Sequence, residues 1–228
     1  MAFRDDLRRI RAIVWKDWTT ERRSKAGFNS VVSLGITILV LFGLALGPDS
    51  QMLRDAAAGC LWLAVLFAGV LAFNRSYQVE LDGGALEALL LYPGSRWAIF
   101  AGKLIANLIF VILMLGIVVA VGLVLFGVRV PAQWPSLIGL MLLGVFGIVS
   151  LGTFYAAMSS RSRAREVLLP LLLYPMLIPV LLAAMMATKL FLAGDMMNEL
   201  HTWVSLLGAF DVIFLVATFL AFEYVIEV

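Results

Sequence analysis

The sequence predicts an all-α, polytopic membrane protein with six transmembrane helices, an N-terminal interfacial helix and a short cytoplasmic coupling helix between the second and third spans. Of its 228 residues, 63% are hydrophobic and 14% are charged, against about 45–50% and about 25% in ordinary soluble domains. The mean hydropathy is +1.02. Apolar runs recur that are long enough to cross a hydrocarbon core of about 30 Å. These observations exclude a soluble globular protein and indicate one transmembrane domain over residues 1–228.

The six spans follow from apolar windows, and the basic residues give their orientation. The windows cover residues 29 to 46, 56 to 73, 101 to 126, 134 to 158, 167 to 188 and 203 to 225. One side carries Arg4, Arg8, Arg9, Arg11, Lys16, Arg22, Arg23, Lys25, Arg75, Arg96, Lys103, Arg161, Arg163 and Arg165; the other carries Arg54, Arg129 and Lys189. The positive-inside rule therefore predicts that both termini are cytoplasmic, by 14 basic residues to 3.

The first 28 residues predict a helix that lies on the cytoplasmic leaflet. Phe3, Leu7, Ile10, Val14 and Trp18 recur at intervals of three and four residues, which places them on one helical face. Tryptophans favour the headgroup region of a bilayer. The alternative is a basic flank that only fixes the topology.

Residues 74–100 predict a cytoplasmic coupling region. After the turn formers Asp82 and Gly84, leucines occupy one face of a short helix that ends at Pro93. Exposed leucines need a cover, either from a cytoplasmic subunit that docks there or from the protein's own bundle. The set expected to bind such a subunit is Glu80, Asp82, Gly84, Leu86, Glu87, Leu89, Leu90 and Pro93.

Three prolines interrupt the fifth span, Pro170, Pro175 and Pro179. Each removes a backbone donor and clashes with the preceding turn, which predicts a kinked or partly unwound helix. Such a helix either acts as a hinge beside a pathway or is simply bent to fit the bundle.

Asp211 stands about nine residues into the sixth span. A charge there costs about 3 kcal/mol, which the apolar residues of that span outweigh. Asp211 is therefore expected to face the bundle interior or a partner, or to be protonated. A functional acid and an interhelical hydrogen bond both remain open.

Several kinds of chemistry are excluded. The chain has one cysteine, Cys60, and one histidine, His201. One residue of each type cannot form an internal disulfide or a Cys/His metal cluster, and a Ser/His/Asp triad would have to use the single histidine. No P-loop occurs: the nearest match, Gly102 with Lys103, is followed by Leu104. The chain is thus expected to be a non-catalytic subunit with no metal, no directly bound cofactor and no nucleic acid partner.

Four stretches resemble the B subunit of the system I cytochrome c maturation machinery, often called haem exporter protein B. They are Gly47-Pro48 with Ala57, Gly59 and Trp62; GALEALLLYP at 84–93 with RWAIFAGK at 96–103; LLPLLLYPMLIPVLLAA at 168–184; and AFDVIF at 209–214 with FEYVIE at 222–227. The family usually has an acidic residue directly before GALE, whereas this chain has Gly83 there and Asp82 one residue earlier.

The resemblance implies the membrane subunit of an ATP-binding cassette transporter in the bacterial inner membrane. It implies five kinds of partner: a separate ATPase subunit, a haem-handling membrane subunit, a small membrane subunit, a periplasmic haem chaperone and a second copy of this chain. ATP would bind the ATPase, and haem would be handled by the complex. Whether haem itself is moved, or the loaded chaperone is released, stays open. The alternatives are an ion-coupled secondary carrier that uses Asp211 or Glu223, and a non-catalytic scaffold.

Overall fold

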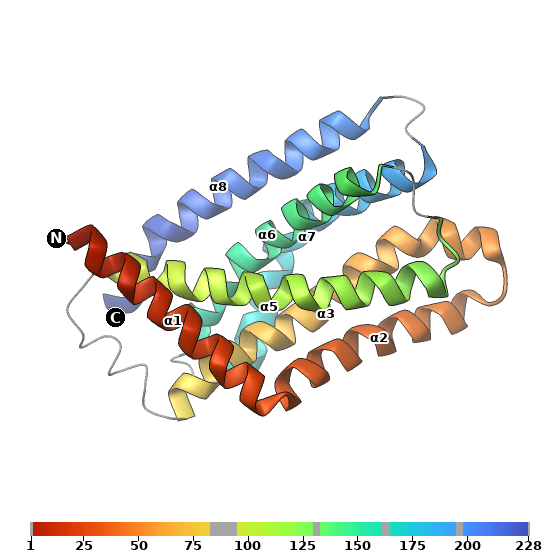
Figure 1. Cartoon of the computed structure of the whole chain (residues 1–228). Helices are drawn as coiled ribbons and strands as arrows, with labels where there is room; N and C mark the ends of the chain where they lie inside the picture. Colours follow the sequence, from red (N-terminus) through yellow and green to blue (C-terminus); the bar gives the residue numbers. More distant parts are fainter. Residues whose placement is uncertain (1, 83–94, 130–132, 161–164, 195–197, 228) are drawn as a thin grey trace.

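The computed structural model describes residues 2–82, 95–129, 133–160, 165–194 and 198–227 (Figure 1). Every regular element in these ranges is a helix. The helices are α1 (Ala2–Ser24), α2 (Ala26–Leu46), α3 (Ser50–Asp82), α5 (Arg96–Leu125), α6 (Trp134–Ser159), α7 (Arg165–Ala193) and α8 (Leu200–Glu227). Six of them, α2 to α8, are long and apolar enough to span a membrane, which confirms the predicted polytopic all-α fold.

The six long helices run alongside one another, and both chain termini lie at the same end of the bundle (Figure 1). We call this the terminal end. Helices α3 and α6 form the centre, because about two thirds or more of their apolar windows are buried, against one third or less in the other four spans. Helix α6 packs against α7 and α8, and α2 packs against α3 and α5.

Large aromatic side chains fit against glycines in the centre of the bundle. A Cβ at Gly144 would collide with Trp62, and one at Gly152 would collide with Phe73. The indole of Trp62 also donates a hydrogen bond to Thr188 Oγ1 at 3.0 Å, so its polar atom is satisfied away from water. The small residues of α6 therefore allow close helix packing.

Helix α1 crosses α5 at the terminal end (Figure 1). It packs through Asp6, Arg9 and Ile13, which are buried, whereas Leu7 and Trp18 of the predicted apolar face are exposed. The helix turns sharply into α2 at Lys25, whose φ of 41° is left-handed. Leu7 therefore remains available to a bilayer surface, whereas Asp6, Arg9 and Ile13, on a face that the sequence did not single out, pack against the bundle.

All six spans are longer than their predicted windows, and the helix with three prolines is more regular than predicted. Helix α3 continues to Asp82 and α5 begins at Arg96, so much of the predicted link at 74–100 is helical extension of its neighbours. Helix α7 is one uninterrupted helix through its three prolines, so the expected unwinding does not occur there. The prolines lie on partly exposed faces, while Leu169, Leu173 and Leu177 make the buried contacts.

Candidate functional site

The ammonium group of Lys103 joins three helices at the terminal end. Lys103 belongs to α5 and is 1% exposed. Its Nζ donates to the carbonyl of Ser76 in α3 at 2.9 Å and forms an ion pair with Asp17 Oδ2 of α1 at 3.0 Å. The same group lies 5.1 Å from the centre of the Tyr77 ring. A buried ammonium requires such partners, because its desolvation is otherwise very costly.

Helix α1 can approach α5 closely because the residue before Lys103 is a glycine, Gly102. A Cβ at Gly102 would stand 3.0 Å from the Cβ of Ile13, closer than side chains normally pack. Asp6, Ile13 and Asp17 share one face of α1, since they are spaced by seven and four residues. This face brings the Asp17 carboxylate onto Lys103.

A second set of contacts fixes the first residue before α5. The backbone N–H of Ser95 donates to Asp6 Oδ1 at 3.3 Å, and the Ser95 hydroxyl donates to the same oxygen. Arg9 Nη1 donates to the Ser95 carbonyl at 3.4 Å. Asp6 therefore caps the start of α5 from a different helix, where Ser95 makes no side-chain cap of its own.

Helix α1 thus contacts the chain on both sides of residues 83–94: Ser76 of α3 through Lys103 and Asp17, and Ser95 directly. We call these contacts the α1 clamp. Glu80 and Asp82 lie in the last turn of α3. The remaining residues of the predicted docking set lie outside the described residues, as does the predicted short helix: Gly84, Leu86, Glu87, Leu89, Leu90 and Pro93.

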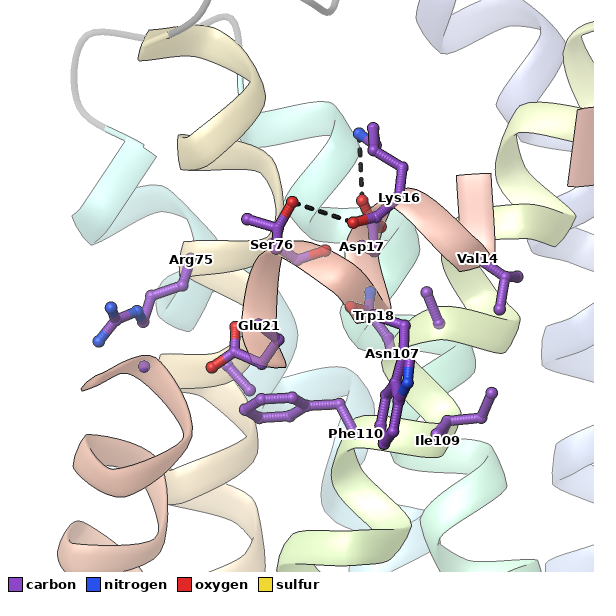
Figure 2. Close-up of a pocket in the computed structure, with 14 residues that line it drawn as sticks. Val14, Lys16, Asp17, Trp18, Glu21, Arg75, Ser76, Asn107, Ile109 and Phe110 are labelled. Atoms are coloured by element: carbon purple, nitrogen blue, oxygen red, sulfur yellow. Dashed lines mark hydrogen bonds and ion pairs between the residues drawn. The ribbon is translucent and has the colours of Figure 1, made fainter. Parts of the chain in front are cut away.

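A cavity of about 390 Å³ adjoins the clamp, between α1, α2, α3 and α5. Figure 2 shows Trp18, Asn107, Ile109 and Phe110 around it, with Asp17 joined to Lys16 by an ion pair of 3.1 Å. Glu21 and Arg75 line the same space. The site therefore combines apolar walls with groups of both charges at one end of a transmembrane bundle.

Asp211 lies in the bundle interior, one of the placements that its sequence position suggests. It is 3% exposed, and neither carboxylate oxygen has a hydrogen-bond partner in the described part of the chain. It comes from α8 and lies against Gly147 of α6, where a Cβ would collide with Oδ1. Val180 of α7 borders the same glycine. The functional role of Asp211 stays a prediction.

Buried polar pairs continue from Asp211 toward the terminal end. Ser150 Oγ and Thr218 Oγ1 lie 3.5 Å apart between α6 and α8. Asn107 of α5 donates to Thr153 Oγ1 of α6 at 3.0 Å. Gly147, Ser150 and Thr153 follow at intervals of three residues on α6, and Asn107 lies one turn after Lys103 on α5. These buried polar residues thus form a row that leads from Asp211 to the α1 clamp.

The structure does not gather the other predicted residues into this site. The hinge role of Pro170, Pro175 and Pro179 is untested, since α7 is continuous. Cys60 is buried in the core, and His201 is exposed near the start of α8. Asp6 and Asp17 were not predicted as contact residues from the sequence; they are two of the four acids in the first 28 residues, spaced by about three helical turns on one face.

Comparison with known proteins identifies relatives over most of the chain. Residues 8–228 match the model of the family described as CcmB protein. Heme exporter protein B of Rhodobacter capsulatus is 30% identical over 176 residues, covering 76% of this chain and 79% of that protein. Heme exporter protein B of Pseudomonas aeruginosa is 30% identical over 189 residues, covering 82% of this chain and 83% of that protein.

Proposed function

The chain belongs to the CcmB family, and from this membership we propose that it is the permease subunit of an ATP-binding cassette complex that handles haem during biogenesis of c-type cytochromes. The relatives' name, heme exporter protein B, supports the haem assignment. The six apolar spans support a membrane subunit. The proposed location is the bacterial inner membrane with both termini cytoplasmic, which the distribution of basic residues favours.

In this proposal the chain does not hydrolyse ATP. A separate ATPase subunit docks on the coupling region at 74–100, and its motion passes into α3 and α5. The partners in the membrane are a haem-handling subunit, a small subunit and a second copy of this chain. The complex serves a periplasmic haem chaperone, either by exporting haem or by releasing the loaded chaperone from a neighbouring subunit.

The observation that carries the proposal is the α1 clamp. An external subunit that pushes on residues 83–94 needs fixed attachment points at both ends of that segment, or the motion is lost in local bending. Ser76 is tied through the buried Lys103 and Asp17, and Ser95 is tied through Asp6 and Arg9. Movement there would therefore reach α1, α3 and α5 together.

The test is co-purification of the ATPase subunit with charged variants of the coupling region. Leu86→Asp or Leu89→Asp should release the ATPase while the permease inserts at its normal level, because a carboxylate in an apolar socket is strongly disfavoured. Met52→Asp places the same charge on an exposed residue at the opposite end of the bundle and should retain the ATPase. The proposal would be falsified if both leucine variants kept full ATPase association and cytochrome c maturation.

A second candidate is an ion-coupled carrier, which the unpaired carboxylate of Asp211 favours. Glu223, the other acid of this hypothesis, follows three turns later in α8, with its side chain outside the described residues. A carrier predicts gradient-driven uptake by the reconstituted chain alone. The ATP-coupled complex predicts transport or chaperone release only with the ATPase subunit and ATP.

A further inference from the structure

Two cavities under the α1–α2 connection remain unused by the proposed function. The cavity beside the α1 clamp measures about 390 Å³, and its neighbour measures about 300 Å³. Trp18, Glu21 and Phe110 line both. Each volume lies in the range of about 300–1,000 Å³ that is typical of small-molecule sites. The pair forms a hollow where α1 meets the membrane-spanning helices.

The polar part of the hollow presents a carboxylate and a guanidinium over a glycine. Glu21 Oε1 is buried, with no hydrogen-bond partner in the described part of the chain. A Cβ at Gly27 of α2 would stand 2.5 Å from this oxygen and 3.2 Å from Arg75 Nη2 of α3. The glycine thus lets the Glu21 carboxylate approach α2 closely beside the Arg75 guanidinium, and both charged groups line the first cavity (Figure 2). A buried oxygen without a donor is costly, which favours a ligand that supplies an N–H.

The apolar part continues onto the lipid-facing side of α5. Phe110 packs edge-on against Phe28 of α2, with ring centroids 5.4 Å apart. Ile109 and Leu113, which line the first and second cavities, are 37% and 44% exposed. Exposed aliphatic residues on a spanning helix contact acyl chains. The hollow is therefore open to the bilayer at its apolar side and charged at its inner side.

We propose that this hollow binds the headgroup and the first acyl carbons of a phospholipid that carries a primary ammonium, of the phosphatidylethanolamine class. The ammonium donates to Glu21 Oε1, and the phosphate binds the guanidinium of Arg75, which suits phosphate oxygens in a two-donor geometry. The acyl chains lie along Phe110, Ile109 and Leu113. The bound lipid fills the space between α1 and the spans.

The chemistry of the walls distinguishes this lipid from other ligands. A quaternary choline headgroup has no N–H to satisfy Glu21, and phosphatidylglycerol has no cation. Haem is disfavoured because none of the residues that line either cavity in the described ranges is His, Cys, Met or Tyr. Lys16, Arg22 and Lys25 also line the hollow and attract any phosphate, so the discrimination between headgroups rests on Glu21.

The experiment is native mass spectrometry of the full-length chain after exchange into defined lipids. The wild type should retain phosphatidylethanolamine about tenfold more than phosphatidylcholine of the same acyl chains, and phosphatidylglycerol should be retained less. Water-soluble glycerophosphoethanolamine should not displace the lipid, because the acyl contacts contribute to binding. Equal retention of the ethanolamine and choline lipids, or displacement by the soluble headgroup, contradicts the proposal.

Variants separate the two charged contacts. Glu21→Gln should remove the preference for ethanolamine over choline, and Arg75→Gln should lower retention of every phospholipid severalfold. Gly27→Leu should displace the Glu21 carboxylate from its place against α2 and lower retention without a change of charge. Arg54→Gln, an exposed site at the opposite end of the bundle, should keep the wild-type pattern. An unchanged lipid preference in Glu21→Gln sinks the assignment, and the wild-type comparison remains decisive if a variant fails to fold.

Discussion

Lys103 and Asp17 form an ion pair in which Nζ and Oδ2 lie 3.0 Å apart, with the lysine side chain 1% exposed and the aspartate side chain 20% exposed. The two residues lie 86 positions apart in sequence and belong to helices that do not follow one another. Their contact attaches the N-terminal helix to the span that directly follows the coupling region. This attachment makes α1 part of the bundle rather than a tail beside it.

The ion pair predicts unequal effects of its two single variants. Asp17→Asn removes a carboxylate from a buried ammonium and should lower the free energy of unfolding by about 2–3 kcal/mol, less than for a fully buried pair because Asp17 is partly exposed. Lys103→Met removes the buried charge and keeps most of the volume, so its cost should be smaller. Thermal unfolding in detergent measures both.

The double variant and a neighbouring lysine serve as controls for this prediction. Asp17→Asn with Lys103→Met should be more stable than Asp17→Asn alone, because no buried charge then lacks its carboxylate partner. Lys16→Gln removes the more exposed lysine that also pairs with Asp17 and should change the stability little. Additive losses in the double variant would count against a direct electrostatic link.

The distribution of basic residues predicts which side of the membrane each end of the bundle faces. Cysteines at Ser50 or Asn198, exposed residues at the end opposite the termini, should react with an impermeant thiol reagent added outside the cell. Cysteines at Ser24 or Gly84 should react only after the membrane is opened. Cys60 is buried and gives a low background. Labelling of Gly84→Cys from outside would overturn the orientation and the docking proposal together.

Two substitutions of Asp211 distinguish the role of its hydrogen bonding from the role of its charge. Asp211→Asn keeps the size and hydrogen-bonding capacity of the side chain, whereas Asp211→Leu removes both polar functions. If the residue only stabilises the bundle or binds a partner, the Asn variant should keep assembly and c-type cytochrome production, and the Leu variant should weaken both. Lost function in the Asn variant at normal protein level would favour a titrating acid.

The space beside Gly147 is too small for a side chain, because Asp211 and Val180 occupy it. In Gly147→Ala the new methyl group would meet Asp211 Oδ1 and the Val180 side chain, so the helices must separate or the carboxylate must move. The expected loss is about 1–3 kcal/mol of stability, as in other overpacked cores. Gly139→Ala, where a Cβ meets nothing within 4 Å, is the matched control in the same helix. Thermal unfolding should therefore differ between the two alanine variants.

The fold was largely predictable from sequence because hydropathy and basic residues determine spans almost without tertiary information. Apolar windows located all six spans, and the burial of Asp211 followed from the cost of a charge in a bilayer. The α1 clamp was not predictable, because Asp6 and Asp17 do not stand out among the four acids and eight basic residues of the first 28 residues, and their partners are 86 or more residues away. The three prolines of α7 do not unwind the helix, although their local propensity favours a break, and the hinge role stays a prediction.

The contact between Asp6 and Ser95 predicts a variant that binds the ATPase subunit but transmits its motion poorly. Ser95 directly precedes α5 and follows the coupling region, so Asp6 fixes the point where force on that region would enter the span. Asp6→Ala removes the acceptor of both Ser95 donors and should loosen α1 at a cost of about 1–2 kcal/mol, the range of a lost helix cap. The docking residues themselves are unchanged.

The expected result is therefore normal co-purification of the ATPase with a severalfold lower yield of c-type cytochromes per ATP hydrolysed. Ser95→Ala, which removes the hydroxyl donor and keeps the backbone N–H bond to Asp6, should show a smaller loss in the same direction. Asp5→Ala, a neighbouring exposed acid, should behave as the wild type. If Asp6→Ala instead lost the ATPase completely, α1 would belong to the docking surface; if it changed neither binding nor yield, the clamp would have no role in coupling.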